Sequence, residues 1–150
     1  MKICIVSTPI RPIPTNFPPM GSMVIMQSLR TLFKREDIKF HHIDFHRYTK
    51  KENLKYFKKN NFDFVGISAV VSTAYKYTQY LAKLIKSVNS NTIVFVGGGL
   101  AASAEVLHRK ANIDYTVIGD GEIIVQNLVK SLIEKKTTDE DLRKIKGITF

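Results

Sequence analysis

Apolar residues gather along the chain in five short runs, and amphipathic segments separate these runs. Three of the runs are almost continuously apolar, which is typical of strands covered on both faces. The run at 38–44 alternates apolar and polar residues instead, which indicates a strand in an outer position of the sheet. The predicted strands are residues 2–7, 38–44, 62–70, 92–97 and 114–119.

The segments between these runs have the period of amphipathic helices. Helices are predicted from three apolar stripes: Ile25, Leu29, Leu32 and Phe33; Ala74, Tyr77, Leu81, Leu84, Ile85 and Val88; and Ile124, Val125, Leu128, Leu132 and Ile133. Residues 100–113 predict one further short helix. Strands that alternate with helices imply a parallel sheet with right-handed crossovers. The expected fold is therefore α/β, a flavodoxin-like (Rossmann-like) three-layer domain. Its five-stranded parallel sheet takes the order 2-1-3-4-5, which is common for five strands.

Two segments do not fit this alternation of strands and helices. Residues 7–21 contain all five prolines of the chain and form a stiff, extended strap, and loops of that length are often functional. Residues 136–150 begin with a helical signal, Thr138 as N-cap with Asp141 three residues later, and end in a strand-like run. We therefore expect a domain over residues 1–135, then a linker and the start of a following domain over 136–150.

The composition is that of one ordinary globular domain, with 150 residues of which 44% are hydrophobic. The chain has no signal peptide and no apolar run long enough to span a membrane, so a cytoplasmic protein without a membrane partner is expected. Its one cysteine, Cys4, cannot form an internal disulfide, which favours a reducing compartment. Cys4 stands in the apolar run KICIV, and a buried structural thiol is expected there.

The net charge of +10 raises the question of an acidic partner. Much of the positive charge lies in KKENLKYFKK, residues 50–59, which is predicted to form a short helix with Leu54 and Phe57 facing inward. No helix-turn-helix, zinc finger or RNP aromatic pattern accompanies it, so nucleic acid is not expected as a partner. A solvated lysine-rich surface is the simpler interpretation, and docking on an acidic partner or nucleic acid is the alternative.

Ligands of open parallel sheets bind beyond the carboxyl ends of the strands, and three of these ends carry small residues. They are SAVVSTA (68–74), GGGLAAS (97–103) and GDGE (119–122). Each has a structural alternative: helix caps for the first, a tight turn for the second, and acidic residues at a helix N-terminus for Asp120 and Glu122. Their shared character on adjacent strands favours one broad, flat ligand.

The glycine run also spells the dinucleotide fingerprint G-x-G-x-x-A through Gly97, Gly99 and Ala102, with Asp120 about 20 residues later. In a dinucleotide site this turn follows the first strand of a βαβαβ unit, whereas here it follows the fourth. The position of the glycines therefore argues against a dinucleotide.

Motifs spread along the chain resemble the N-terminal cobalamin (vitamin B12)-binding domain of cobalamin-dependent radical S-adenosylmethionine enzymes. They are PPMG (18–21), Asp44, FDFVGIS (62–68), VGGGLAAS (96–103) and DYTVIGDGEIIVQNLVKSL (114–132), with Asp120 where the family usually has glutamate. The resemblance implies cobalamin held between this domain and a following barrel, with its nucleotide tail beside the sheet. The implied cofactor-binding residues are Met20, Gly21, Ser68, Val70, Val71, Thr73, Gly97, Gly98, Gly99, Ser103, Gly119, Asp120, Gly121 and Glu122.

The same resemblance implies base-off cobalamin without a histidine ligand. Asp44 and His46 start like the D-x-H-x-x-G motif of other cobalamin proteins, but they follow the second strand and Thr49 replaces the glycine. The parent protein would be a methyltransferase, with its 4Fe-4S cluster and S-adenosylmethionine in a downstream barrel, because this chain lacks C-x-x-x-C-x-x-C. No catalytic or metal-ligating residues are predicted in the chain itself. The alternatives are a domain that has lost cobalamin and serves a structural or docking role, and an independent enzyme.

Overall fold

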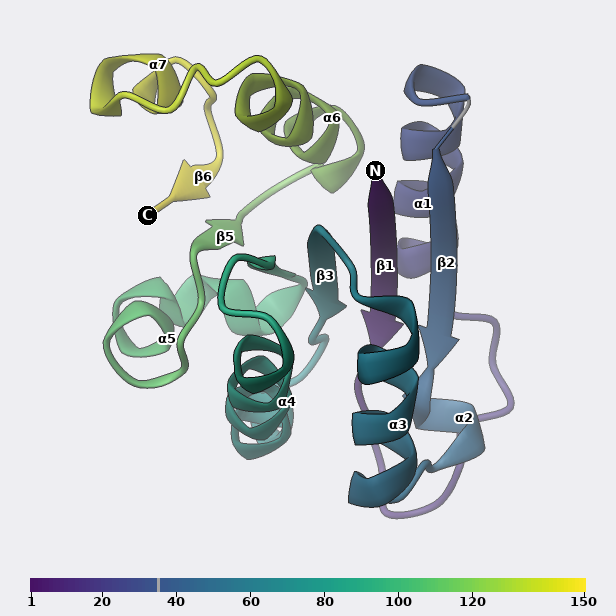
Figure 1. Cartoon of the computed structure of the whole chain (residues 1–150). Coiled ribbons are helices and arrows are strands. Elements are labelled where there is room, and N and C mark those ends of the chain that lie inside the picture. Colours follow the sequence, from purple (N-terminus) through teal and green to yellow (C-terminus); the bar gives the residue numbers. More distant parts are fainter. Residues whose placement is uncertain (35) are drawn as a thin grey trace.

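The computed structural model describes residues 1–34 and 36–150 and shows a twisted sheet between two layers of helices (Figure 1). Strands β1 to β5 are parallel and take the order β2-β1-β3-β4-β5, as predicted. A sixth strand pairs antiparallel with β5, so the sheet has one strand more than the five predicted parallel strands. The strands are β1 (Lys2–Ser7), β2 (Asp37–His42), β3 (Phe64–Ser68), β4 (Ile93–Gly97), β5 (Tyr115–Val117) and β6 (Ile148–Thr149).

Helices cover both faces of the sheet, and two separate apolar clusters fill the spaces beneath them. One face carries α3 (Lys50–Asn60), α4 (Tyr75–Val88) and α5 (Ala104–Lys110). The other carries α1 (Met20–Leu32), α6 (Gly121–Ile133) and α7 (Asp139–Arg143). The remaining turns are α2 (Ile43–His46), η1 (Ser72–Ala74) and η2 (Gly99–Ser103).

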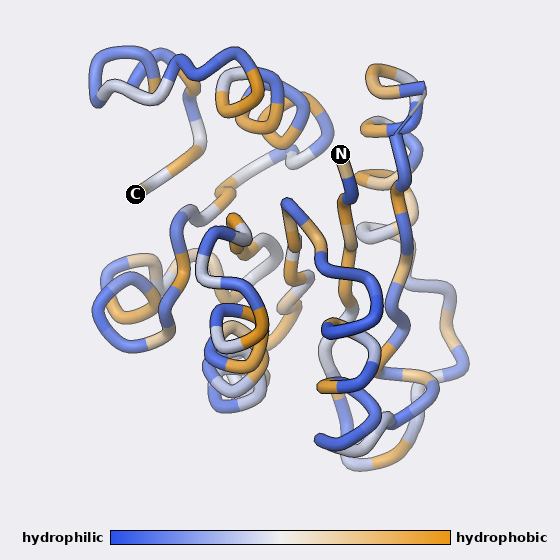
Figure 2. The backbone as a smooth tube through the Cα atoms, viewed as in Figure 1, coloured by the Kyte–Doolittle hydropathy of each residue, from blue (hydrophilic) through white to orange (hydrophobic). Residues whose placement is uncertain are grey.

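Side chains alternate between these two clusters along each strand, as the pleat of a strand requires. On β1, Cys4 and Val6 belong to the α3/α4/α5 cluster, whereas Ile3 and Ile5 belong to the α1/α6/α7 cluster. Strands β1, β3 and β4 are accordingly apolar along most of their length, whereas β2 alternates between polar and apolar residues (Figure 2). Cys4 is fully buried, as predicted, and burial raises the pKa of its thiol to about 12, so the thiol stays protonated at neutral pH.

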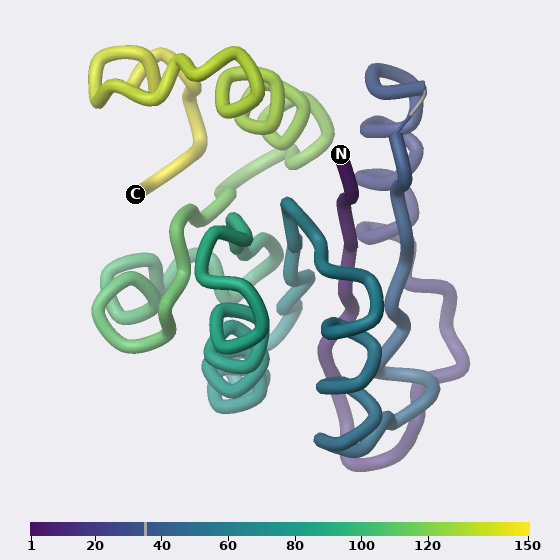
Figure 3. The backbone as a smooth tube through the Cα atoms, viewed as in Figure 1, coloured from purple at the N-terminus to yellow at the C-terminus, as the bar shows by residue number. Residues whose placement is uncertain are grey.

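The proline-rich strap between β1 and α1 is held by an ion pair at the end of β2. The predicted second strand stops at His42, and residues 43–46 form the single turn α2 instead. There the buried Asp44 accepts a hydrogen bond from the Ile10 amide at 2.9 Å and pairs with Arg47 at 3.1 Å. The Arg47 guanidinium also donates to the carbonyls of Arg11 and Ile13. The strap therefore runs past α2 rather than away from the domain (Figure 3).

The segment after α6 also packs on the domain. Thr138 caps α7, and its hydroxyl accepts a hydrogen bond from the Asp141 amide, as predicted. Leu142 is buried in the α1/α6/α7 cluster, and the Thr149 hydroxyl contacts Thr116 and the His108 ring. Among the described helices, none combines the length and hydrophobicity needed to cross a membrane.

The lysine-rich helix α3 forms as predicted and buries Phe57, but Leu54 is only half-buried. Its inward face instead carries Asn53, whose side-chain oxygen lies 2.8 Å from His41 Nε2. The His41 ring is stacked between Tyr56 and Tyr48, with centroids 3.8 and 4.5 Å away. Burial lowers the pKa of His41, because a charged imidazolium loses its solvation there.

This buried histidine predicts a loss of stability in acid. The unfolded chain takes up the proton more readily than the folded one, so the free energy of unfolding is highest above pH 6.5 and falls as the pH drops below that value. Urea unfolding between pH 8 and 5 measures this slope. His41→Gln is expected to flatten this slope, because it removes the buried titrating ring. His42, whose pKa burial also lowers, accounts for the remaining slope. An equal slope in wild type and His41→Gln would contradict the prediction.

Candidate functional site

A row of small and polar residues crosses the carboxyl edge of the sheet. The register aligns Ser7 with His42 on β2 and with Ser68 on β3, and Ser68 with Gly97 on β4. Side-chain alternation places Gly66, Ser68 and Gly97 on the same face as Phe64 and Phe95, beneath α1 and α6. Because none of these three residues has a large side chain, space remains between the sheet and the helices at this edge.

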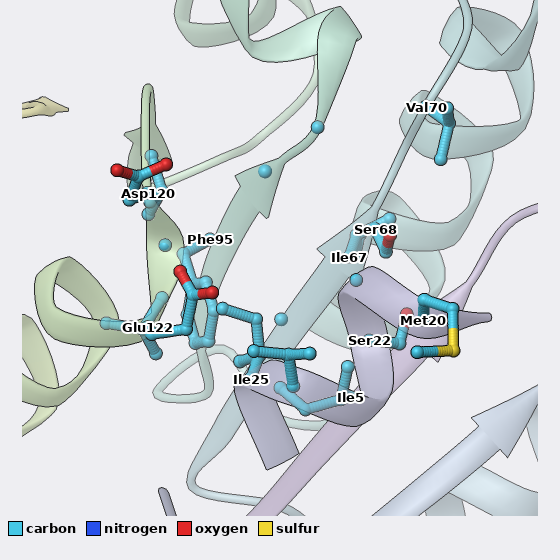
Figure 4. A pocket seen from close by; sticks show the side chains of 18 of the residues that line it. Ile5, Met20, Ser22, Ile25, Ile67, Ser68, Val70, Phe95, Asp120 and Glu122 are labelled. Carbon is cyan, nitrogen blue, oxygen red and sulfur yellow. The ribbon is translucent and has the colours of Figure 1, made fainter. Parts of the chain in front are cut away.

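That space is a pocket of about 350 Å³. Its floor consists of Ile5, Phe95 and Val117, and its walls are the first turns of α1 and α6. In Figure 4, Met20, Ser22 and Ser68 lie on one side of the pocket, and Asp120 and Glu122 on the other. A pocket of this volume with an apolar floor and a few polar groups is typical of cofactor sites.

The Phe95 ring forms the floor because Gly66 lies beside it on the neighbouring strand. A Cβ at Gly66 would overlap two ring carbons of Phe95 and lie 2.9 Å from Ile5 Cδ1. Gly66 therefore lets the Phe95 ring occupy the space beside the β3 backbone that a Cβ would otherwise fill. A single glycine inside an apolar strand often marks such a close approach, and this was the available signal that sequence reasoning missed.

The three glycines after β4 differ in what they do. A Cβ on Gly97 would meet only Val117 atoms at 3.9 Å or more, so this residue faces open space. Gly98 has φ +89° and ψ −174°, which is a region that only glycine adopts readily, and its Cβ would lie 2.7 Å from the Ala69 carbonyl oxygen. A Cβ on Gly99 would lie 2.5 Å from the Val70 carbonyl oxygen. Gly98 and Gly99 thus allow the loops after β3 and β4 to pack together, and only Gly97 leaves room for a ligand.

Two hydrogen bonds set the distance between the helices that form the pocket walls. The Ser28 hydroxyl of α1 donates to the Glu122 carbonyl at 2.7 Å, and the Gln126 amide of α6 donates to the Ser28 carbonyl at 2.6 Å. Close to them, a Cβ on Gly121 would lie 2.8 Å from Ile25 Cδ1. The start of α6 is therefore held directly against α1.

The polar groups of the pocket suit a largely neutral ligand. The Ser22 hydroxyl is buried without a hydrogen-bond partner, and Ser22 lines the pocket. Asp120 and Glu122 supply the only charges among the lining residues that the structure describes, and no lysine or arginine lines the pocket. Asp120 makes no side-chain capping bond, so the first amides of α6 are left without that partner.

The structure brings most of the predicted site residues together and leaves four apart. Ten line the pocket: Met20, Gly21, Ser68, Val70, Gly97, Gly98, Gly119, Asp120, Gly121 and Glu122. Val71, Thr73, Gly99 and Ser103 do not. Val71 packs on the α3/α4/α5 cluster at the opposite face, and Gly99 lies against the Val70 carbonyl. The lining residues that were not predicted are Ile5, Ser22, Val24, Ile25, Gly66, Ile67, Phe95, Val117 and Val125.

The histidines lie away from this pocket. His41 is buried under α3, His46 is exposed on α2, and the His108 ring contacts Thr149. His42 lines a smaller neighbouring pocket. Across residues 1–34 and 36–150, no three His, Cys, Asp or Glu side chains form a group that could hold a metal ion.

The fold and pocket are those of a three-layer α/β domain that binds a ligand beyond the carboxyl ends of its strands. The B12 binding domain family matches residues 7–129, so the chain belongs to this family. The family that the sequence motifs indicate is thereby confirmed, and cobalamin is the cofactor for which that family is named. No curated protein matches the chain.

Solved structures with the same fold include two radical S-adenosylmethionine enzymes, of which OxsB is described as cobalamin-dependent. The methyltransferase TsrM from Kitasatospora setae superposes with a TM-score of 0.79 at 19% identity, over 99% of this chain and 28% of TsrM. OxsB with aqua-cobalamin and S-adenosylmethionine bound gives 0.78 at 18% identity, over 99% of this chain and 20% of OxsB. A cobalamin-binding protein from Desulfitobacterium hafniense DCB-2 gives 0.56 at 18% identity, over 83% of this chain and 57% of that protein. The chain thus spans less than a third of the two enzymes.

The surroundings of Gly97 and Gly98 predict different effects on stability when each is replaced by alanine. Gly97→Ala is expected to change the free energy of unfolding by less than about 0.5 kcal/mol, because the added methyl group enters open space. Gly98→Ala is expected to cost about 1–3 kcal/mol, because alanine is strained at that φ and ψ and meets the Ala69 carbonyl. Urea unfolding of both variants measures the difference, and equal stabilities would contradict this account of the loop.

Proposed function

We propose that this chain is the cobalamin-binding module of a cobalamin-dependent radical S-adenosylmethionine enzyme, and that the parent protein is a methyltransferase. One observation carries the proposal: Gly66, Ser68 and Gly97 leave a pocket in the face beneath α1 and α6, with the unpartnered Ser22 hydroxyl on its wall. A flat aromatic group such as the dimethylbenzimidazole of cobalamin needs this combination of an apolar floor and few polar partners.

Different residues of the pocket contact different parts of the nucleotide tail in this proposal. Phe95 and Ile5 provide the apolar floor on which the aromatic group packs. Ser68 offers a hydroxyl to its ring nitrogen or ribose, and the open amides at the start of α6 offer further donors. The strap that leads to Met20 and Gly21 borders the mouth and faces the corrin ring. Cobalamin, when bound, supplies a cobalt centre that carries a methyl group.

The proposed binding mode is base-off and without a histidine ligand. A tail that occupies the pocket beside the sheet is held away from the cobalt. No histidine is found among the described residues that line this pocket, and the exposed His46 lies on α2. A lower face without a protein ligand favours reduced cobalt, which suits methyl transfer.

The radical step belongs, in this proposal, to a barrel that follows the cobalamin module. A 4Fe-4S cluster needs several cysteine ligands, and this chain has only Cys4, which is buried. The cluster and S-adenosylmethionine would therefore bind in that barrel. Residues 1–135 would form the module and residues 136–150 its connection, which Leu142 attaches to the domain.

A domain that has lost cobalamin and serves for docking is the second candidate. Exposed apolar side chains at the mouth favour it, since Phe17, Met20 and Val70 are 70%, 62% and 52% exposed. A partner could cover these side chains with or without cobalamin beneath. Purified protein that stays colourless after mixing with hydroxocobalamin and desalting would favour this second function.

Filling the pocket tests the cobalamin proposal directly. Wild type is expected to retain hydroxocobalamin through a desalting column, with an absorbance spectrum of the base-off form. Gly97→Leu is expected to lose retention without loss of stability, because the added side chain enters the pocket from a position with free space. Ala102→Leu, an exposed position outside the pocket, is the matched control and is expected to retain the cofactor. Retention by Gly97→Leu would show that this pocket does not hold the tail.

The parent enzyme is tested by the coding sequence downstream of Phe150. The proposal expects an in-frame C-x-x-x-C-x-x-C motif there, because the radical reaction requires a cluster that this chain cannot ligate. A reading frame that continues without such a motif would refute the radical enzyme and leave the cobalamin site to be judged by its own test.

A further inference from the structure

A second, smaller pocket of about 120 Å³ lies beneath the proline-rich strap. The smaller pocket adjoins the larger pocket, because the two share lining residues. One ligand can therefore occupy both pockets. The shared residues are Met20, Gly21, Ser22, Ser68 and Val70. The strap supplies Ile10, Thr15, Phe17 and Pro19, and the ends of β1 and β2 supply Ser7 and His42.

Three buried hydroxyls around this small pocket have no hydrogen-bond partner in the described structure. They are Ser7 Oγ, Thr15 Oγ1 and Ser22 Oγ, and Ser7 and Ser22 are only 6% and 2% exposed. Buried polar groups in folded proteins are almost always paired, and each unpaired one costs stability. Three such groups on the wall of one cavity indicate that the cavity receives a group able to pair with them.

The charges around the pocket restrict what that group is. Asp44 lines the pocket and is 3% exposed, and its negative charge is balanced by Arg47 at 3.1 Å. No lysine or arginine is among the described lining residues, and burial lowers the pKa of His42 toward the neutral form. An anionic ligand would be repelled by the Asp44 carboxylate, and no lysine or arginine among the described residues lines the pocket to offset that repulsion. A cationic ligand is disfavoured because Arg47 already neutralises the Asp44 charge. A neutral group that both donates and accepts hydrogen bonds fits best.

The volume and the apolar lining of the smaller pocket further restrict which chemical group it can receive. A volume of 120 Å³ equals that of about four water molecules, enough for a group of four or five heavy atoms. Ile10, Phe17 and Pro19 form an apolar part of the wall, which suits a short methylene stem. A primary carboxamide on such a stem has N–H donors for Asp44 and a carbonyl that accepts from the hydroxyls.

We propose that this pocket binds one of the carboxamide arms at the edge of the corrin ring while the nucleotide tail occupies the larger pocket. This inference rests on the proposed cobalamin function and adds a second anchoring point to it. The strap thereby becomes part of the binding site, and the Asp44–Arg47 pair holds it in place for the amide.

The test compares the affinity of three variants for hydroxocobalamin by equilibrium dialysis. Thr15→Val and Ser7→Ala each remove one hydroxyl that lines only the smaller pocket. Each is expected to weaken binding between about fivefold and 100-fold, because one hydrogen bond to the amide is lost in a buried place. Thr78→Val is the matched control, since the Thr78 hydroxyl is equally buried and unpartnered but lies on α4 and lines neither pocket.

Stability without cobalamin separates a binding role from a structural one. Thr15→Val and Thr78→Val are both expected to be as stable as wild type or more stable, because each removes an unpaired buried hydroxyl. Only Thr15→Val is expected to weaken cobalamin binding. A Thr15→Val variant with wild-type affinity would show that the small pocket holds only water and would overturn the inference.

The same inference can be tested by changing the ligand instead of the protein. Among the isomeric cobalamin monocarboxylic acids, in which one amide is hydrolysed, one isomer is expected to lose affinity at neutral pH because its carboxylate faces Asp44. That isomer's penalty is expected to shrink in Thr15→Val. Equal affinities of all isomers would overturn the amide assignment. If wild type retains no cobalamin at all, the proposed function itself fails, and the amide site fails with it.

Discussion

The pocket of this domain depends on one packing contact, the Phe95 ring lying against the backbone of Gly66. A parallel sheet covered on both faces normally fills both with large side chains, as β1 and β4 do over most of their length. On the α1/α6 face, however, Gly66 accepts the ring that would otherwise occupy the space above it. The ring then serves as floor, and the absence of side chains at Gly97 keeps the volume above it open.

Specific contacts set the distance between α1 and α6, the two helices above the pocket. Ser28 and Gln126 connect α1 to α6 through two short hydrogen bonds, and the lack of a Cβ at Gly121 lets Ile25 approach the start of α6. The Ser28 and Gln126 side chains do not line the pocket, so their hydrogen bonds fix its width without filling it. The walls are thus positioned by contacts within the domain before a ligand binds, which lowers the entropic cost of binding there.

The strap is a different kind of wall, since its backbone has few partners of its own. Asp44 and Arg47 supply them from the turn that follows β2, through the Ile10 amide and the Arg11 and Ile13 carbonyls. An ion pair that is also hydrogen-bonded to backbone constrains both of its partners and the loop. It thereby links the outer strand of the sheet to the edge of the cofactor site, a distance of more than 30 residues along the chain.

The sequence by itself determined the alternation of strands and helices, the family and most of the pocket's glycine and acidic residues. These follow from local signals: apolar periodicity, prolines and glycines at strand ends, and the GGGLAAS and GDGE motifs. Only the tertiary structure decided which glycines face the ligand. Gly98 and Gly99 lie against the carbonyls of Ala69 and Val70, about 30 residues away, whereas Gly97 is open. It also placed Ser22, Phe95 and Gly66 in the site and Val71 outside it, because the direction of a side chain depends on the pleat and on the packing of distant elements, and no local pattern carries that information.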